Sequence, residues 1–356
     1  MEEEHHFLVG LDTDYSQVED SYAKIKDYPS ICIFEGHNSK SVDYTIAIPT
    51  YKRGELLKEA VDSALTQVDC PDYNIIVVDN NPERNDITEQ LMQQYKGSNV
   101  SYYKHPINLG MGGNWNRAVE LTPGKWMILL HDDDKLMPTF IHEVDKVAKL
   151  HPDAGFIQTK KFFGEKPSDF IPNKVCSKYS MFDVVLRRKS IFTTSGMMYR
   201  KEAYMSFPGM PYDQYQSYAL WYSLLLVRDF DCYYIDKELT YYRIGETNES
   251  TKSFLHANLI RYDYALFHYG LRCAHIPNFI ALPYLQQYVI NAEGGWRNVW
   301  HSNFVFPKEI SKTKYSQKRC NLSVKIMSKL ARYSDVWNDY TIPQLIKKSF
   351  LKIFNR

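Results

Sequence analysis

Three consecutive carboxylates, Asp132, Asp133 and Asp134, follow an apolar run in this sequence. The run at 126–130 has the pattern of a buried strand, and a helical pattern begins at Phe140. Adjacent carboxylates repel one another and are costly to desolvate, so a triplet at the end of a buried strand needs a compensating cation. A divalent metal carrying a phosphate-bearing ligand is one such cation. The alternative is a solvated acidic loop, in which aspartate serves as turn former and helix N-cap.

The composition excludes several other classes of protein. With 356 residues, 44% hydrophobic and 24% charged, the chain has enough apolar residues for a large folded core. The net charge of +1 gives no global field that would attract nucleic acid. The six cysteines are scattered without a Cys-x-x-Cys pair, and the acidic start of the chain lacks the apolar core of a signal peptide. These features predict a protein of the reducing cytoplasm.

The elements between residues 44 and 158 alternate between strand and helix. Continuous apolar strands are predicted at 44–48, 73–78, 100–103, 126–130 and 154–158, with helical patterns between them. This alternation predicts an α/β fold with a mostly parallel central sheet covered on both faces.

Ligands of such sheets bind beyond the carboxyl ends of the strands. Four polar segments are predicted to meet at this edge: Pro49-Thr-Tyr51, Asp79-Asn-Asn81, the glycine-rich loop at 108–114 and the acid triplet. Their convergence favours the metal-site interpretation of the triplet. The glycine loop by itself is equally explained by a plain turn, because it lacks the Gly-Lys-Ser/Thr of a phosphate-binding loop.

The rest of the chain is less regular and mainly helical beyond residue 252. We expect an N-terminal extension at 1–43, a main α/β domain at 44–245, and a helical C-terminal region at 246–356. From Lys308 onward there are twelve lysines and arginines but only three acids. The basic amphipathic pattern at 344–354 predicts either binding to an anionic membrane surface or docking of the apolar face on the protein itself.

Four motifs in order resemble the family 2 glycosyltransferases of the GT-A fold, a Rossmann-type sandwich. They are Ile46-Ala-Ile-Pro-Thr-Tyr-Lys-Arg53, Ile75-Ile-Val-Val-Asp-Asn-Asn81, Asn108-Leu-Gly-Met-Gly-Gly-Asn-Trp-Asn-Arg117 and Leu129-Leu-His-Asp-Asp-Asp134. The resemblance is strong over 44–158, weaker to about 245 and absent beyond. It implies that the domain at 44–245 binds the nucleotide-sugar and the acceptor. It implies an inverting transfer of a sugar from a nucleotide diphosphate donor, with uracil as the first expectation for the base. The acceptor would be a glycan or lipid-linked glycan in surface polysaccharide synthesis, and the protein would be cytoplasmic, with a peripheral position at the inner face of the membrane.

The resemblance also implies roles for individual residues. Asp133 would hold Mn²⁺ or Mg²⁺ with support from Asp134, and the ion would neutralise charge on the leaving diphosphate. The residues expected at the nucleotide and donor sugar are Pro49, Thr50, Tyr51, Arg53, Asp79, Asn114, Arg117 and Asp132.

The sequence departs from the family pattern at two functional positions. Asn80 follows Asp79 where the family often has a second acid, and His131 stands where it commonly has the first aspartate of its DxD motif. The family's catalytic base, an acid at the start of a later helix, has no match in Gln214-Tyr-Gln-Ser-Tyr-Ala-Leu-Trp221. Asp213 is the candidate base, with a role as N-cap of that helix as the alternative. A non-catalytic sugar-nucleotide or glycan-binding protein is therefore the alternative function. A nucleotidyltransferase is disfavoured by the lack of a basic, glycine-rich loop after the first strand.

Overall fold

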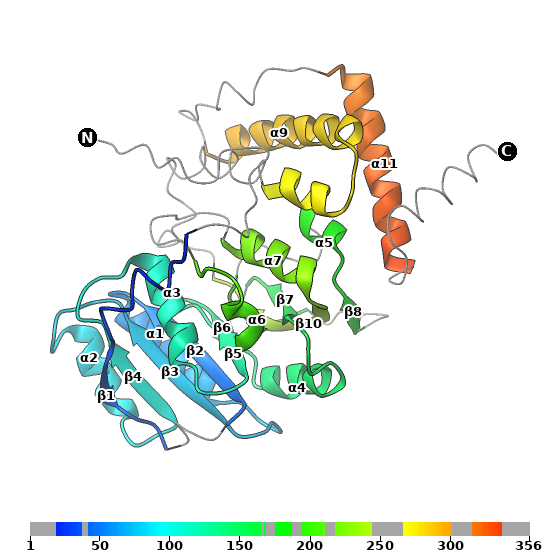
Figure 1. Ribbon diagram of the computed structural model, residues 1–356. Coiled ribbons are helices and arrows are strands. Elements are labelled where there is room, and N and C mark those ends of the chain that lie inside the picture. Colours follow the sequence, from blue (N-terminus) through cyan, green and yellow to red (C-terminus); the bar gives the residue numbers. More distant parts are fainter. Residues whose placement is uncertain are drawn as a thin grey trace, which may run out of the picture.

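A computed structural model describes residues 19–37, 42–164, 167–168, 175–186, 194–210, 218–243, 266–300 and 315–336. Its centre is a sheet whose strands lie in the order β1-β4-β3-β2-β5-β9-β7-β10-β6, with β8 paired to β10 (Figure 1). The strands are β1 Ile31–Phe34, β2 Tyr44–Thr50, β3 Tyr73–Asp79, β4 Val100–Lys104, β5 Trp126–Leu129, β6 Lys135–Leu136, β7 Phe156–Phe162, β8 Cys176–Lys178, β9 Met197–Arg200 and β10 Tyr233–Tyr241. The prediction of an α/β fold is confirmed.

The strands predicted in the first half form the parallel part of the sheet. Strands β4, β3, β2 and β5 run side by side in parallel, with Ile46 opposite both Ile75 and Ile128. Every residue of β2 and β5 is buried, as expected for strands covered on both faces. Because the four strands are parallel, their carboxyl ends meet at one edge, where the polar segments were predicted to converge.

Helices on the two faces of this sheet enclose separate cores. Side chains alternate along a strand, so Ile46 and Ile48 face α1 and α4, while Ala47 faces α3 and α7. The covering and connecting helices are α1 Gly54–Leu65, α2 Ile87–Met92, the 3₁₀ turn η1 Gln93–Tyr95, α3 Gly110–Leu121, α4 Phe140–Leu150, α5 Met181–Val185, α6 Lys201–Met205 and α7 Tyr218–Asp229. The glycine-rich segment begins α3 at Gly110, so much of the predicted loop is helical.

The other half of the sheet is mixed. Strand β9 is antiparallel to both β5 and β7, whereas β10 is parallel to β7 and antiparallel to β6 and β8. Residues Tyr233–Tyr241 form one strand, β10, with irregular register between Ile235 and Thr240. Part of the predicted extension also belongs to the sheet, since β1 pairs antiparallel with β4.

The described part of the C-terminal region is helical, as predicted. Helices α9 Asn278–Trp300 and α11 Gln317–Val336 pack against each other beyond α5 and α7 (Figure 1). Within the described part of the chain, no helix combines the length and the apolar character that crossing a membrane requires.

Candidate functional site

The acid triplet lies in a tight turn directly after β5. The turn is closed by the N–H of Asp134, which donates to the carbonyl of His131 at 3.2 Å. The N–H of His131 donates to Ser195 Oγ at 3.2 Å, and His131 Nε2 is 3.0 Å from Thr194 Oγ1. The turn is therefore fixed both by its own backbone and by the segment that leads into β9.

Residues from the end of β2 and the following loop hold the first two acids. Thr50 Oγ1 donates to Asp132 Oδ2 at 2.8 Å. Arg53 Nη1 donates to Asp132 Oδ1 at 3.3 Å and to Asp133 Oδ2 at 2.8 Å. The guanidinium thus offsets the repulsion between two neighbouring, largely buried carboxylates.

The third acid is held by the end of β10. The backbone N–H of Arg243 donates to Asp134 Oδ1 at 2.9 Å, and Arg243 Nε donates to the carbonyl of Asp133 at 2.9 Å. Arg243 Nη2 also pairs with Glu59 Oε2 on α1 at 2.6 Å. Lys135 Nζ lies 3.1 Å from the same glutamate oxygen. Arg243 therefore links the turn to two distant elements of the fold.

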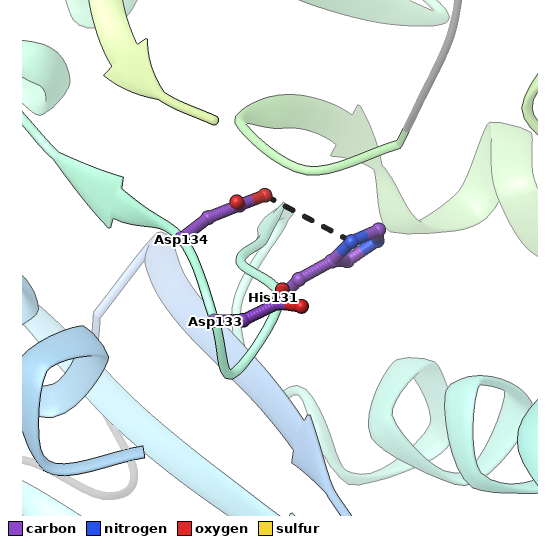
Figure 2. A group of neighbouring side chains, drawn as sticks. All are labelled: His131, Asp133 and Asp134. Atoms are coloured by element: carbon purple, nitrogen blue, oxygen red, sulfur yellow. Dashed lines mark ion pairs between the residues drawn. The ribbon is translucent and has the colours of Figure 1, made fainter. Parts of the chain in front are cut away.

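The donor set at this turn fits a divalent cation. Ligand atoms of His131, Asp133 and Asp134 lie within 4.8 Å of one another, and Figure 2 shows their side chains around the turn. Asp134 Oδ2 is buried without a hydrogen-bond partner, 3.9 Å from His131 Nδ1. A buried carboxylate oxygen without a partner is costly, so a cation at this point would supply the missing interaction. The ion would share Asp133 with Arg53.

Burial governs the electrostatics of the turn. Burial raises the pKa of Asp132 to about 6 and that of Asp134 to about 7. It lowers the pKa of His131 to about 4, which keeps the imidazole neutral near pH 7, as a metal ligand must be. Lys161, on β7, is also buried, and burial lowers its pKa to about 7 against the opposing charge of Asp134. A bound dication would favour the ionised form of the carboxylates.

The predicted base-binding segment is divided between the core and the surface. Pro49 is a buried residue inside β2, opposite Val78, so the strand does not end before it. Tyr51 follows β2 and is 43% exposed, which leaves its ring available to a planar ligand. Asn114, in α3, donates to the carbonyl of Thr50 at 3.3 Å and accepts from His105 Nε2 at 2.9 Å. Asn114 therefore fixes the end of β2 beside the acid turn.

Two residues that were predicted to bind the nucleotide use their polar groups in other contacts. The fully buried Asp79 carboxylate accepts from Tyr102 at 2.6 Å and from Lys104 Nζ at 3.0 Å. The Arg117 guanidinium donates to the carbonyls of Ile25 and Tyr28 at 2.6 and 3.1 Å. The structure therefore does not bring either side chain to the acid turn: the first orders the end of β3, and the second anchors the segment before β1.

Two other predictions lie outside the described residues. They concern the candidate base Asp213, in the segment 211–217, and the basic amphipathic tail, in the segment 337–356.

Three residues of the site were missed as participants by sequence reasoning. His131 was noted only as a departure from the DxD pattern, although its place beside the acids could have suggested a ligand. Arg243 and Lys161 are 109 and 27 residues from Asp134, and no motif connects them to it. Long-range β pairing brings them to the turn.

Comparison with known proteins agrees with this fold. The model of the family described as glycosyl transferase family 2 matches residues 45–207. An uncharacterized glycosyltransferase of Methanocaldococcus jannaschii is 25% identical over 143 residues, which cover 39% of this chain and 49% of that protein. The O-antigen biosynthesis protein RfbC of Myxococcus xanthus is 28% identical over 124 residues, 34% of this chain and 9% of RfbC. The chain thus spans half or less of the curated relatives it matches.

Among solved structures, S. aureus TarS 1–349 in complex with UDP-GlcNAc superposes with a TM-score of 0.51 at 16% identity. The match covers 84% of this chain and 93% of that one. The superposition therefore shows that the fold is of the GT-A type. Residues 45–207 are the part of the chain that matches glycosyl transferase family 2.

Proposed function

We propose that this protein is a metal-dependent, inverting glycosyltransferase that takes a sugar from a nucleotide diphosphate donor, with a UDP-sugar as the first candidate. The observation that carries the proposal is the buried turn of Asp132, Asp133 and Asp134 at the carboxyl edge of the parallel strands. The unpartnered oxygen of Asp134 and the nearby His131 suit Mn²⁺ or Mg²⁺. The UDP-GlcNAc named for the TarS structure supports a nucleotide-sugar donor.

In this proposal His131, Asp133 and Asp134 hold the ion. When bound, the ion supplies Lewis-acid stabilisation of the charge that develops on the leaving diphosphate. Thr50 and Arg53 fix Asp132 and Asp133, so the carboxylates need little rearrangement before the donor binds. The exposed ring of Tyr51 offers a stacking surface for the base. Asp213 is proposed to accept the proton of the acceptor hydroxyl, which inversion requires.

The acceptor is proposed to be a glycan or lipid-linked glycan of a surface polysaccharide. The name of the RfbC relative, an O-antigen biosynthesis protein, supports this class of acceptor. A lipid-linked acceptor would place the enzyme at the inner face of the membrane, in contact with anionic lipid through the basic pattern at 344–354. Removal of residues 340–356 would then weaken binding to anionic vesicles, and equal binding after the deletion would contradict this part of the proposal.

The activity is tested by screening UDP-, GDP- and dTDP-sugars by thermal shift with Mn²⁺, followed by assay of nucleoside diphosphate release. We expect one donor class to stabilise the protein and to be turned over. Asp133→Asn should reduce turnover by at least about a hundredfold, since it weakens the charge that holds the ion. Asp153→Asn, an exposed acid in the turn after α4, is the matched control and should leave turnover unchanged. Binding of a donor without turnover would instead favour the non-catalytic alternative.

A further inference from the structure

Helix α11 has a buried face and an opposite, exposed face. Cys320 and Met327 are fully buried, and Leu330 is 8% exposed. Met327 and Leu330 belong to the core that also contains residues of α5 and α7. The buried face therefore fixes the orientation of α11 in the helical region.

Four residues form a continuous stripe on the exposed face, here named the α11 stripe: Lys318, Leu322, Lys325 and Lys329. Their spacing of four, three and four places them along one side of the helix, over about 16 Å. Leu322 is 57% exposed, so an apolar side chain projects from the middle of a cationic surface.

The described residues around the stripe do not neutralise its charge. Over the described residues, none of the three lysines has an ion-pair partner. Residues 315–330 contain no acid, and residues 278–288 of the neighbouring α9 carry no charge at all. Since the whole chain has a net charge of only +1, the stripe is a local excess and not part of a generally basic surface.

We propose that the α11 stripe docks the protein on anionic lipid headgroups. Lysine side chains of one helix face can reach the headgroup phosphates, and each contributes roughly fivefold to binding near an anionic surface. The exposed Leu322 favours a bilayer over a soluble polyanion, because its side chain can enter the boundary between headgroups and acyl chains. The proposal needs neither the glycosyl transfer nor the segment at 337–356, and it can be tested separately from both.

The test is cosedimentation of the full chain with vesicles of phosphatidylcholine, with or without phosphatidylglycerol. The triple variant K318Q/K325Q/K329Q should bind the anionic vesicles about a hundredfold more weakly. The control variant K26Q/K96Q/K125Q removes the same charge from exposed lysines elsewhere and should lose less than threefold. A triple stripe variant that differs from this control by less than threefold would overturn the proposal.

Leu322→Ser distinguishes a membrane from a soluble polyanion, because it leaves the charge unchanged. We expect weaker binding to anionic vesicles and unchanged binding to inorganic polyphosphate. A different result would be that Leu322→Ser binds vesicles like the wild type while the triple variant no longer binds polyphosphate. The stripe would then be a site for a soluble polyanion, and the lipid assignment would be wrong. All substituted side chains are exposed, so equal thermal stability of the variants is expected and confirms that they fold.

Discussion

Asp134 accepts a hydrogen bond at 2.9 Å from the backbone N–H of Arg243, which lies 109 residues further along the chain. The Arg243 side chain continues this connection to the Asp133 carbonyl and to Glu59 on α1. The orientation of the two acids therefore depends on the end of β10 and on α1, as well as on their own turn. Groups that orient metal ligands in this way commonly affect metal affinity strongly.

Glu59→Gln tests this connection. The substitution weakens the pair with Arg243 and should raise the Kd for Mn²⁺ by about tenfold, because the acid turn loses its fixed orientation. Isothermal titration calorimetry with Mn²⁺ measures the effect. Glu55→Gln removes the same charge from an exposed position of the same helix and should change the Kd by less than twofold. Equal effects of the two substitutions would show that charge alone, and not orientation, is responsible.

Arg53→Gln tests whether the guanidinium competes with a metal ion for Asp133. Without the guanidinium of Arg53, the two largely buried carboxylates repel each other. The metal-free variant should therefore be about 1–3 kcal/mol less stable than the metal-free wild type. Added Mn²⁺ should then raise the melting temperature more than it does in the wild type, since binding to the folded state adds stability. Lys52→Gln, at the exposed neighbouring position, is the control and should behave like the wild type. A Mn²⁺ shift in Arg53→Gln no larger than in the wild type would contradict the competition.

Because His105 is buried, we expect the stability of the protein to depend on pH. Burial lowers its pKa from 6.5 to about 4, so between these values the unfolded chain binds the proton and the folded protein does not. The stabilising contribution is complete above pH 6.5 and decreases as the pH falls towards 4, by at most about 3 kcal/mol. His105→Gln keeps one donor and one acceptor for Asn114 and Ser30 but does not titrate. Urea denaturation at pH 7 and pH 4.5 should show a smaller loss in the variant, and parallel losses would contradict the assignment.

Gly196 is required where the chain turns into β9. Its φ is +69°, and an added Cβ would lie 2.1 Å from Thr240 Oγ1. Gly196→Ala should therefore destabilise the protein by more than about 3 kcal/mol, through strain and the clash together. Gly97 has a φ of +86° with nothing within 4 Å, so Gly97→Ala carries the strain alone and should cost about 1 kcal/mol. Similar unfolding free energies for the two variants would show that Thr240 moves away without cost.

The strands of the parallel half could be predicted because each is a continuous apolar run buried on both faces, as at Tyr44–Thr50 and Tyr73–Asp79. The strands of the mixed half of the sheet could not be predicted in this way. Three consecutive charged residues, Asp236, Lys237 and Glu238, interrupt the apolar pattern of β10. Its register is irregular there, so the sequence resembles two short strands. Strand β1 was missed because it is short and pairs only at the edge of the sheet.

The convergence of polar loops at the site could be predicted from parallel topology, and Thr50 and Arg53 do contact the acids. The contacts made by individual side chains could not be predicted. Lys104, which pairs with Asp79, is a fully buried lysine at the end of an apolar strand, and only its three-dimensional partners explain it. The contacts of Arg117 could not be predicted either. Its acceptors are the backbone carbonyls of residues 25 and 28, which cannot be recognised from the residue types there.

The central claim is that the acid turn binds a nucleoside diphosphate through a divalent ion. Calorimetric titration of the protein with UDP, GDP and dTDP in the presence of Mn²⁺ tests it most directly, with Asp134→Asn as the comparison because this residue carries the unpartnered oxygen. We predict that the wild type binds one nucleotide only with Mn²⁺, and that Asp134→Asn weakens this binding by at least about tenfold. Binding of equal strength after chelation of the metal, or in Asp134→Asn, would contradict the account.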